Sequence, residues 1–148
     1  MLTLRRFLST DNTTAAAIIR VVLGAVILPH GLQKTIGLFG GYGFSGTMGF
    51  FTTTLGIPSL VAFLVIMAES LGAVSLIFGF ATRFCAASLA IVMVGAIFMV
   101  HVDNGFFMNW FGAQKGEGFE YHLLVIGMAL SLVFSGAGRF SIDHKLSS

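Results

Sequence analysis

Residues 58–80 read PSLVAFLVIMAESLGAVSLIFGF and are apolar almost throughout. A helix of about 20 apolar residues crosses the hydrocarbon core of a bilayer, so this stretch predicts a transmembrane helix. Glu69 lies near its middle, where insertion measurements put the cost of a charged side chain at roughly 2.5–3.5 kcal/mol. We therefore expect Glu69 to be protonated, to pair with a cation, or to face a polar cavity inside the protein.

The composition of the whole chain is that of an integral membrane protein. Hydrophobic residues make up 56% of the sequence and charged residues only 9%, whereas soluble domains carry about 25% charged residues. The net charge of +2 comes from a few Lys and Arg at the ends of apolar segments, which argues against nucleic acid as a partner. Cys85 is the only cysteine, so the sequence excludes an intrachain disulfide and CxxC redox chemistry.

Hydropathy predicts an all-α membrane protein, a single four-helix transmembrane bundle that fills residues 1–148 and uses the lipid bilayer as its solvent. The spans are expected at about 15–36, 58–80, 84–102 and 119–137. Residues 37–57 are rich in glycine and predict either a short helix in the membrane interface or a plain loop. Aromatic residues in the loop at 103–118 are typical of an interfacial belt: Phe106, Phe107, Trp110 and Phe111. An N-terminal surface helix is a further expectation, carried by Leu2, Leu4, Phe7 and Leu8 around Arg5 and Arg6.

Within each predicted span, a stripe of residues spaced alternately three and four apart should face neighbouring helices. The first stripe contains Ala17, Arg20, Gly24, Ile27, Gly31 and Lys34. The second contains Ala62, Val65, Glu69, Gly72, Leu76 and Gly79. The third contains Arg83, Ala87, Ala90, Val94, Ile97 and His101. The fourth contains Glu120, Leu124, Gly127, Ser131 and Phe134.

Four spans would place both termini on the same side of the membrane. Five basic residues fall on that side and two on the other: Arg5, Arg6, Arg83, Arg139 and Lys145 against Lys34 and Lys115. Because positively charged loops stay inside, we expect both termini in the cytoplasm.

A helical rise of about 1.5 Å per residue brings ionisable groups from four spans to one interior region. Glu69 should lie near the midplane and His30 slightly outward of it, with Arg20 roughly 9 Å inward. We expect Glu69 to pair with Arg20 or Lys34, and Glu120 to pair with Lys34 or His101. The candidates for ligand binding or proton relay are therefore Glu69, His30, Lys34, His101, Glu120 and Arg20. The alternative interpretation is an ion-pair network that only fixes helix register.

His122 follows Glu120 by two residues, which is about 200° around a helix, so the two side chains cannot both point inward. We expect Glu120 to point inward and His122 to lie at the lipid boundary. This arrangement argues against a metal site built from His30, His101 and His122, and no fixed ligand spacing such as HxxxH is present. We predict no metal.

These motifs resemble those of the DoxX family of small four-helix bacterial membrane proteins. The resemblance covers nearly the whole chain and rests on RVVLGAVILPHGLQK (20–34), FFTTTLGIP (50–58), AESLGAVSLIFGFATR (68–83), IVMVGAIFMVHVDNGFF (91–107), FEY (119–121) and SGAGRFSID (135–143). The family's polar signature falls on Arg20, His30, Lys34, Glu69, Arg83, His101, Glu120 and Asp143, and does not include His122. The family often has two glycines after the glutamate, whereas this chain has Ser70 after Glu69 and a single glycine at position 72.

The resemblance implies a location in the bacterial inner membrane and an association with membrane oxidoreductases, since the family is named after a subunit of a thiosulfate:quinone oxidoreductase. It implies a quinone-interacting subunit that takes a quinone from the membrane as its cofactor and electrons from a redox partner protein. Whether the chain is itself an enzyme stays open. One alternative is a proton-coupled binder or transporter of a small solute, with Glu69 as the proton carrier. Another is a non-catalytic accessory subunit of a membrane complex, and a homo-oligomer is compatible with all three functions.

Overall fold

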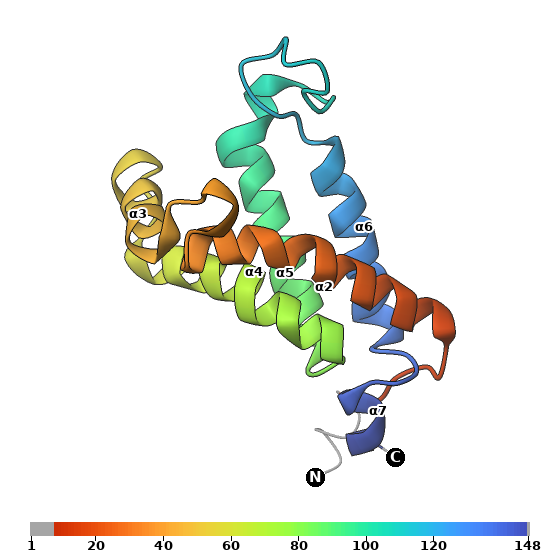
Figure 1. Ribbon diagram of the computed structural model, residues 1–148. Coiled ribbons are helices and arrows are strands. Elements are labelled where there is room, and N and C mark those ends of the chain that lie inside the picture. Colours follow the sequence, from red (N-terminus) through yellow and green to blue (C-terminus); the bar gives the residue numbers. More distant parts are fainter. Residues whose placement is uncertain (1–7, 148) are drawn as a thin grey trace.

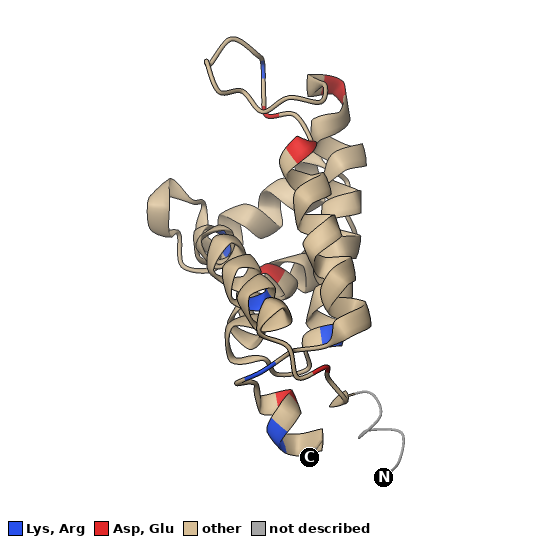
Figure 2. Cartoon of the chain, turned by 90° about the vertical axis from the view of Figure 1, so that its right-hand side faces the viewer, with Lys and Arg blue, Asp and Glu red and all other residues tan. Residues whose placement is uncertain are grey.

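The computed structural model describes residues 8–147, and every regular element within them is a helix (Figure 1). Four helices are long: α2 (Thr14–Thr35), α4 (Ser59–Phe78), α5 (Thr82–Ala96) and α6 (Glu120–Ser135). The expected N-terminal surface helix lies outside the described residues except for Leu8. Charged residues are sparse along the four helices and lie mostly at the two ends of the molecule (Figure 2).

In the part of the chain that the structure describes, three helices are long and apolar enough to cross a membrane: Thr14–Thr35, Ser59–Phe78 and Thr82–Asn104. The third consists of α5 continued by the π-helical turn η3 (Ile97–His101) and the 3-10 turn η4 (Val102–Asn104). The first three predicted spans agree with these helices to within a few residues. The fourth apolar helix, α6, has 16 residues, fewer than the roughly 20 of a typical span.

The connection between α2 and α4 is helical rather than a plain loop. It contains the 3-10 turn η1 (Leu38–Gly40), the helix α3 (Gly43–Gly49) and the π-helical turn η2 (Phe50–Thr54). Of the two alternatives that the sequence left open for residues 37–57, the short helix is correct. The chain ends in the short helix α7 (Ile142–Ser147).

The four long helices form two pairs that cross steeply instead of running as one parallel bundle. α2 lies beside α4, and α5 lies beside α6 (Figure 1). The pairs converge at one end and splay apart toward the ends that carry α3 and the loop at 105–119. At the convergent end the N-terminal segment pairs with the end of α6, since Asp11 N donates to Ser135 O at 3.0 Å. The two ends of the described chain therefore lie on the same side.

Small residues let α2 and α4 approach closely. A Cβ atom added at Gly31 would lie 2.3 Å from the carbonyl oxygen of Glu69, and one added at Gly24 would lie 2.7 Å from that of Ala73. Only glycine permits such backbone contact, which is how many membrane helices associate. The predicted stripe of the first span is thus confirmed as the face that meets α4. The stripe of the second span is correct only at Glu69, because the other α4 residues that meet the α2 glycines are Ser70, Ala73 and Ile77.

The predicted stripe of the fourth span is wrong. Leu124 is 68% exposed and Phe134 is 79% exposed, so this stripe is the outer face of α6. The buried face of α6 contains His122, Val125, Ala129 and Leu132. The third stripe is also partly displaced, because Val94 is exposed while the buried face of α5 contains Cys85, Ala86, Leu89 and Met93. Both helices are apolar on nearly every side, so periodicity alone does not identify the packed face.

Arg20 satisfies backbone carbonyls at the convergent end. Its side chain is buried and donates through Nε to Ala137 O at 2.8 Å, and through Nη1 to Leu76 O at 3.1 Å and to Ile77 O. Nη2 donates to Arg139 O at 3.1 Å and to Phe140 O at 2.8 Å. The expected pairing of Arg20 with Glu69 is therefore wrong. The last carbonyls of a helix have no partner within that helix, and the five N–H donors of a guanidinium suit them well.

Two further charged residues complete this end. Arg83 donates to Phe134 O at 2.8 Å, to Val133 O and to Ser9 O at 3.0 Å, and so caps the C-terminus of α6. The buried carboxylate of Asp143 accepts from Ala81 N and Thr82 N, each at 2.8 Å, at the start of α5. Negative charge at a helix N-terminus is favourable, so Asp143 joins α7 to the turn between α4 and α5.

Replacing Arg20 with methionine should strongly destabilise the protein. The variant keeps an apolar stem but leaves the carbonyls at the end of α4 and after α6 without donors, and each buried unsatisfied group costs about 1–3 kcal/mol. Thermal unfolding in detergent measures the effect. Arg139→Met is the matched control, because the side chain of Arg139 is exposed. Equal melting temperatures for the two variants would contradict this role.

Gly31→Ala should destabilise the protein through a clash between α2 and α4. Overpacking of this kind costs about 1–3 kcal/mol. The control is Gly127→Ala on α6, where an added Cβ would meet nothing within 4 Å, and where alanine should stabilise the helix by roughly 0.5–1 kcal/mol. The two variants should shift the unfolding temperature in opposite directions. A stabilised Gly31→Ala variant would show that the helices are not in close contact here.

Candidate functional site

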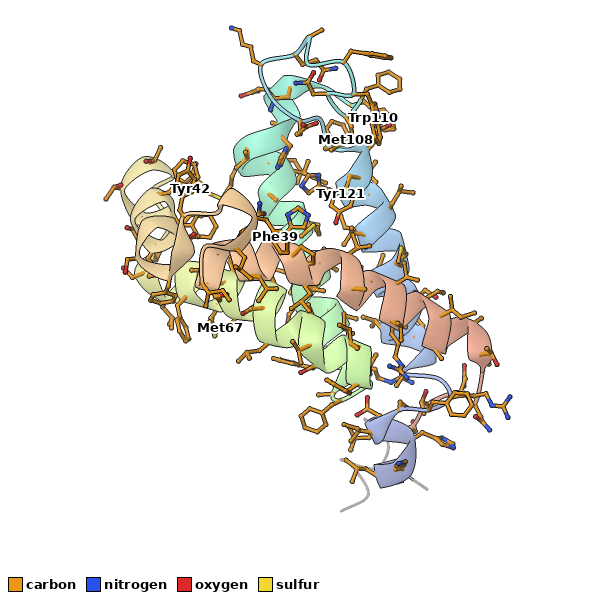
Figure 3. The ribbon with its side chains drawn as sticks, in the orientation of Figure 1. Phe39, Tyr42, Met67, Met108, Trp110 and Tyr121 are labelled. Carbon is orange, nitrogen blue, oxygen red and sulfur yellow. The ribbon has the colours of Figure 1, made fainter. Side chains whose placement is uncertain are left out.

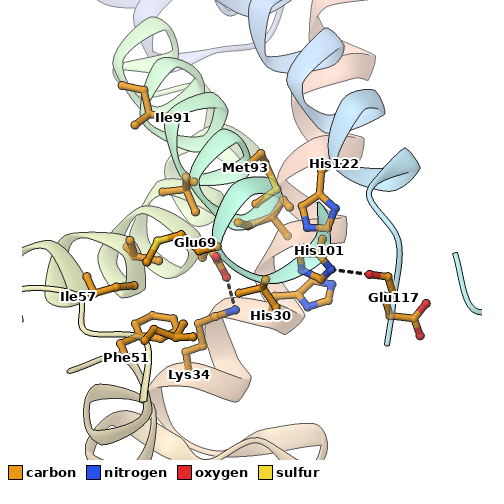
Figure 4. Close-up of a pocket in the computed structure, with 18 of the residues that line it drawn as sticks. His30, Lys34, Phe51, Ile57, Glu69, Ile91, Met93, His101, Glu117 and His122 are labelled. Atoms are coloured by element: carbon orange, nitrogen blue, oxygen red, sulfur yellow. Dashed lines mark hydrogen bonds and ion pairs between the residues drawn. The ribbon is translucent and has the colours of Figure 1, made fainter. Parts of the chain in front are cut away.

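A cavity of about 500 Å³ lies where the two helix pairs splay apart. Its walls come from α2, α4, α5 with η3, α6 and η2, so most elements of the molecule contribute (Figure 4). Most lining residues are apolar, among them Phe50, Phe51, Ile57, Val61, Val65, Ile91, Met93, Met99 and Val100. Polar side chains gather in one part of the wall, and the rest of the cavity is hydrocarbon.

An ion pair joins α2 to α4 in this wall. Lys34 Nζ contacts Glu69 Oε2, and the side chains are 23% and 7% exposed. The pair lies beside Gly31, where the two helices are in backbone contact, so little water can enter between them. Of the two partners predicted for Glu69, Lys34 is the correct one. Two opposite charges with little access to water interact more strongly than they would in bulk solvent.

His101 reaches the cavity from the π-helical turn η3. Its Nδ1 lies 2.8 Å from the carbonyl oxygen of Glu117 in the loop at 105–119. A π-helical turn holds one more residue than a regular turn and is frequent at functional sites. The turn therefore gives His101 a direction that differs from that of a continuous α-helix.

His122 is buried in the same wall, contrary to the expectation that it lies at the lipid boundary. Its side chain is 7% exposed, and its ring centroid lies 4.1 Å from that of His101. Tyr121 is adjacent, with ring centroids 5.6 Å from His122 and 6.3 Å from His30. Figure 4 shows His30, His101 and His122 together on one side of the Lys34–Glu69 pair. We call Lys34, Glu69, His30, His101, His122 and Tyr121 the polar wall.

Two atoms of the polar wall are buried and lack a hydrogen-bond partner among the described residues: His122 Nδ1 and Tyr121 Oη. Buried polar groups are almost always satisfied in folded proteins. Both belong to residues that line the cavity. These two atoms therefore retain unused hydrogen-bonding capacity beside the cavity.

Glu120 does not belong to the polar wall, and its expected pairing with Lys34 or His101 is wrong. Its carboxylate accepts from Met108 N at 3.0 Å and from Trp110 Nε1 at 3.2 Å, so it holds the aromatic loop. Figure 3 shows Met108 and Trp110 at the loop end of the molecule, with Tyr121 between the loop and α2. Glu120 and His122 do point in different directions, as the 200° argument requires, but the inward residue is His122.

The cavity thus collects Glu69, His30, Lys34 and His101 of the six predicted site residues, while Arg20 and Glu120 act elsewhere. Sequence reasoning missed Tyr121, His122 and the backbone of Glu117. A signal for His122 was present, since His122, Val125, Ala129 and Leu132 also follow the alternating spacing. Within residues 8–147, no group of three or more His, Cys, Asp and Glu side chains has the geometry to hold a metal ion.

Comparison with known proteins gives consistent results. The family model described as DoxX matches residues 15–102. A protein of Bacillus subtilis (strain 168) named "Putative oxidoreductase CatD" is 32% identical over 118 residues, which cover 80% of this chain and 78% of that protein. An uncharacterized protein of Haemophilus influenzae is 33% identical over 136 residues, covering 87% and 88% of the two chains. No solved structure gives a significant match. The chain belongs to the DoxX family, as its motifs predict.

Proposed function

We propose that this protein binds a quinone headgroup in its cavity and serves as a quinone-interacting subunit of a membrane oxidoreductase system. The observation that carries the proposal is the polar wall, a buried ion pair with three imidazoles and a phenol inside an otherwise apolar cavity. Small-molecule sites in proteins have this composition, with apolar walls and a few convergent polar groups. Ionisable residues within membrane helices mark functional sites by default.

The polar wall suits the chemistry of a quinone. A quinone is a flat apolar ring with two carbonyl oxygens, and hydrogen-bond donors are therefore what its headgroup needs from the protein. Lys34 Nζ, the imidazole nitrogens and Tyr121 Oη are such donors, and two of the candidate groups are without a partner in the described chain. Reduction of a quinone to a quinol takes up two electrons and two protons. Glu69 and the histidines are groups that can hand over protons, and a redox partner protein supplies the electrons.

A series of polar groups connects the cavity to the loop end of the molecule. Glu117 is exposed on the loop, its carbonyl lies 2.8 Å from His101 Nδ1, and the His101 and His122 rings are adjacent. The Glu117 carbonyl only orients the His101 ring, since a peptide oxygen does not carry protons. The His101 ring itself would take up protons at the loop end and pass them to His122. The relative named as an oxidoreductase supports a redox role for this family member.

We also propose four membrane crossings, with α6 as the fourth and both termini on the cytoplasmic side of the bacterial inner membrane. α6 packs against α5 and α2, and the chain segments before α2 and after α6 lie together at the convergent end. The excess of Lys and Arg expected on that side agrees with this orientation.

Glu69→Gln should weaken binding of a soluble quinone without an isoprenoid tail. The change removes the carboxylate that holds Lys34 in the polar wall, so the affinity should fall by about tenfold or more, as a loss of about 1.4 kcal/mol implies. Isothermal titration of the purified protein in detergent measures the dissociation constant.

The matched control is Glu120→Gln, the same chemical change at a carboxylate that does not line the cavity. It should leave the affinity nearly unchanged. A wild-type protein that neither binds the tail-less quinone nor gains thermal stability from it would rule out the proposed function. Loss of proton-driven solute uptake in Glu69→Gln, with no quinone bound by the wild type, would identify a transporter instead.

A further inference from the structure

A second cavity, of about 610 Å³, lies between α4 and α5. It is lined by residues of these two helices and of the turn that joins them. Four of its lining residues also line the first cavity: Val61, Val65, Ile91 and Val92. The two cavities are therefore neighbours that share part of their lining. Figure 4 shows Ile91 on the opposite side of Glu69 from the three histidines.

The second cavity differs from the first in chemistry, because its lining among residues 8–147 contains no ion pair and no imidazole. Most of its wall consists of aliphatic and aromatic side chains, and the polar side chains present are Ser75, Cys85 and Ser88. The hydroxyl of Ser88 already donates to Phe84 O at 2.9 Å. None of the buried side-chain atoms without a partner in the described residues belongs to this wall. Such a surface accepts hydrocarbon and offers nothing to a polar solute.

The second cavity is long and borders on lipid. Its lining residues on α4 run from Val61 to Ser75, which corresponds to about 20 Å of helix. Leu64, Leu71 and Phe84 lie on its rim and are 55%, 64% and 64% exposed. These residues belong to helices long and apolar enough to cross a membrane, so the rim faces acyl chains. On α4 the cavity extends to both sides of Glu69, and on α5 it extends from the first cavity toward the convergent end, from Val92 to Phe84.

We propose that the second cavity holds the hydrocarbon tail of the ligand whose headgroup binds at the polar wall. The ligand is then a lipid-soluble quinone with a long isoprenoid or alkyl tail, and a small polar solute is excluded. This inference rests on the proposed function, which places the headgroup in the first cavity. It adds a separate tail site, made by the facing surfaces of α4 and α5, and lateral entry from the membrane.

The test compares two quinones with the same ring, one without a tail and one with a decyl tail, in the same lipid nanodiscs. Ser88→Phe places an aromatic ring in the second cavity, and Gly72→Leu is a second variant, at a position where an added Cβ meets only Met67 O at 3.9 Å. Each variant should weaken binding of the decyl quinone by about tenfold, while binding of the tail-less quinone changes little. Each variant is compared with the wild type for the same quinone. The contribution of tail partitioning into the nanodisc lipid is therefore the same on both sides of the comparison and does not affect the ratio of affinities.

Ser131→Phe is the matched control, the same substitution at an exposed position of α6 that lines neither cavity. It should leave both affinities unchanged. If Ser88→Phe and Gly72→Leu affect both quinones equally, or neither quinone, the tail site is wrong while quinone binding stands. That result, together with phospholipid retained by the wild type and lost from the two variants, would identify an ordinary membrane acyl chain as the occupant. If the wild type binds neither quinone, the proposed function fails and the tail site fails with it.

Discussion

The structure depends on a requirement of the hydrocarbon environment, that backbone polar groups find partners within the protein. Helix ends are where this requirement is hardest to meet, because their last carbonyls and first amides have no partner in the helix. Arg20 and Arg83 supply donors to the ends of α4 and α6, and Asp143 supplies an acceptor to the start of α5. These contacts hold the α2–α4 pair and the α5–α6 pair together at the convergent end. Because the pairs cross steeply, a fixed convergent end leaves the opposite ends apart, and the first cavity occupies that space.

The ion pair between Lys34 and Glu69 is better explained by function than by stability alone. Buried ion pairs contribute little net stability, since the cost of removing two charges from water offsets their attraction. α2 and α4 are already held in register by the backbone contacts at Gly24 and Gly31, so the pair is not needed for that purpose. A network that served only to fix register would also satisfy its own members. His122 Nδ1 and Tyr121 Oη have no partner in the described residues, which leaves hydrogen-bonding capacity for the proposed ligand.

The sequence predicts those features that follow from length, apolarity and spacing along one helix. The first three spans and the Lys34–Glu69 pair are of this kind, because Gly31 shares a stripe of α2 with Lys34 and contacts α4 at the backbone of Glu69. The buried face of α6 cannot be predicted in this way, since a helix that is apolar on every side can pack in several rotations about its axis. We expected Arg20 to pair with the Glu69 carboxylate. Instead its guanidinium binds carbonyls at the end of α4 and after α6, which accept more hydrogen bonds from it than one carboxylate could. Glu120 accepts hydrogen bonds from the loop at 105–119 instead. The path of that loop depends on tertiary contacts, which the residue pattern of a single helix does not encode.

The placement of the two cavities matches the way an amphiphile lies in a bilayer. The polar wall lies toward the splayed ends of the helices, and along α5 the second cavity extends from the first toward the convergent end. A tailed quinone in the leaflet next to the splayed ends has its ring toward the membrane surface and its tail toward the midplane. It would therefore enter between α4 and α5 without reversing its orientation in the membrane. A tail that moves from lipid into an apolar cavity gains little hydrophobic free energy, because both surroundings are equally apolar. The tail site would therefore act by orienting the ring toward Lys34, His122 and Tyr121. A tail that finds this site blocked would pull the ring away from these groups, which is why the affinity for a tailed quinone should fall.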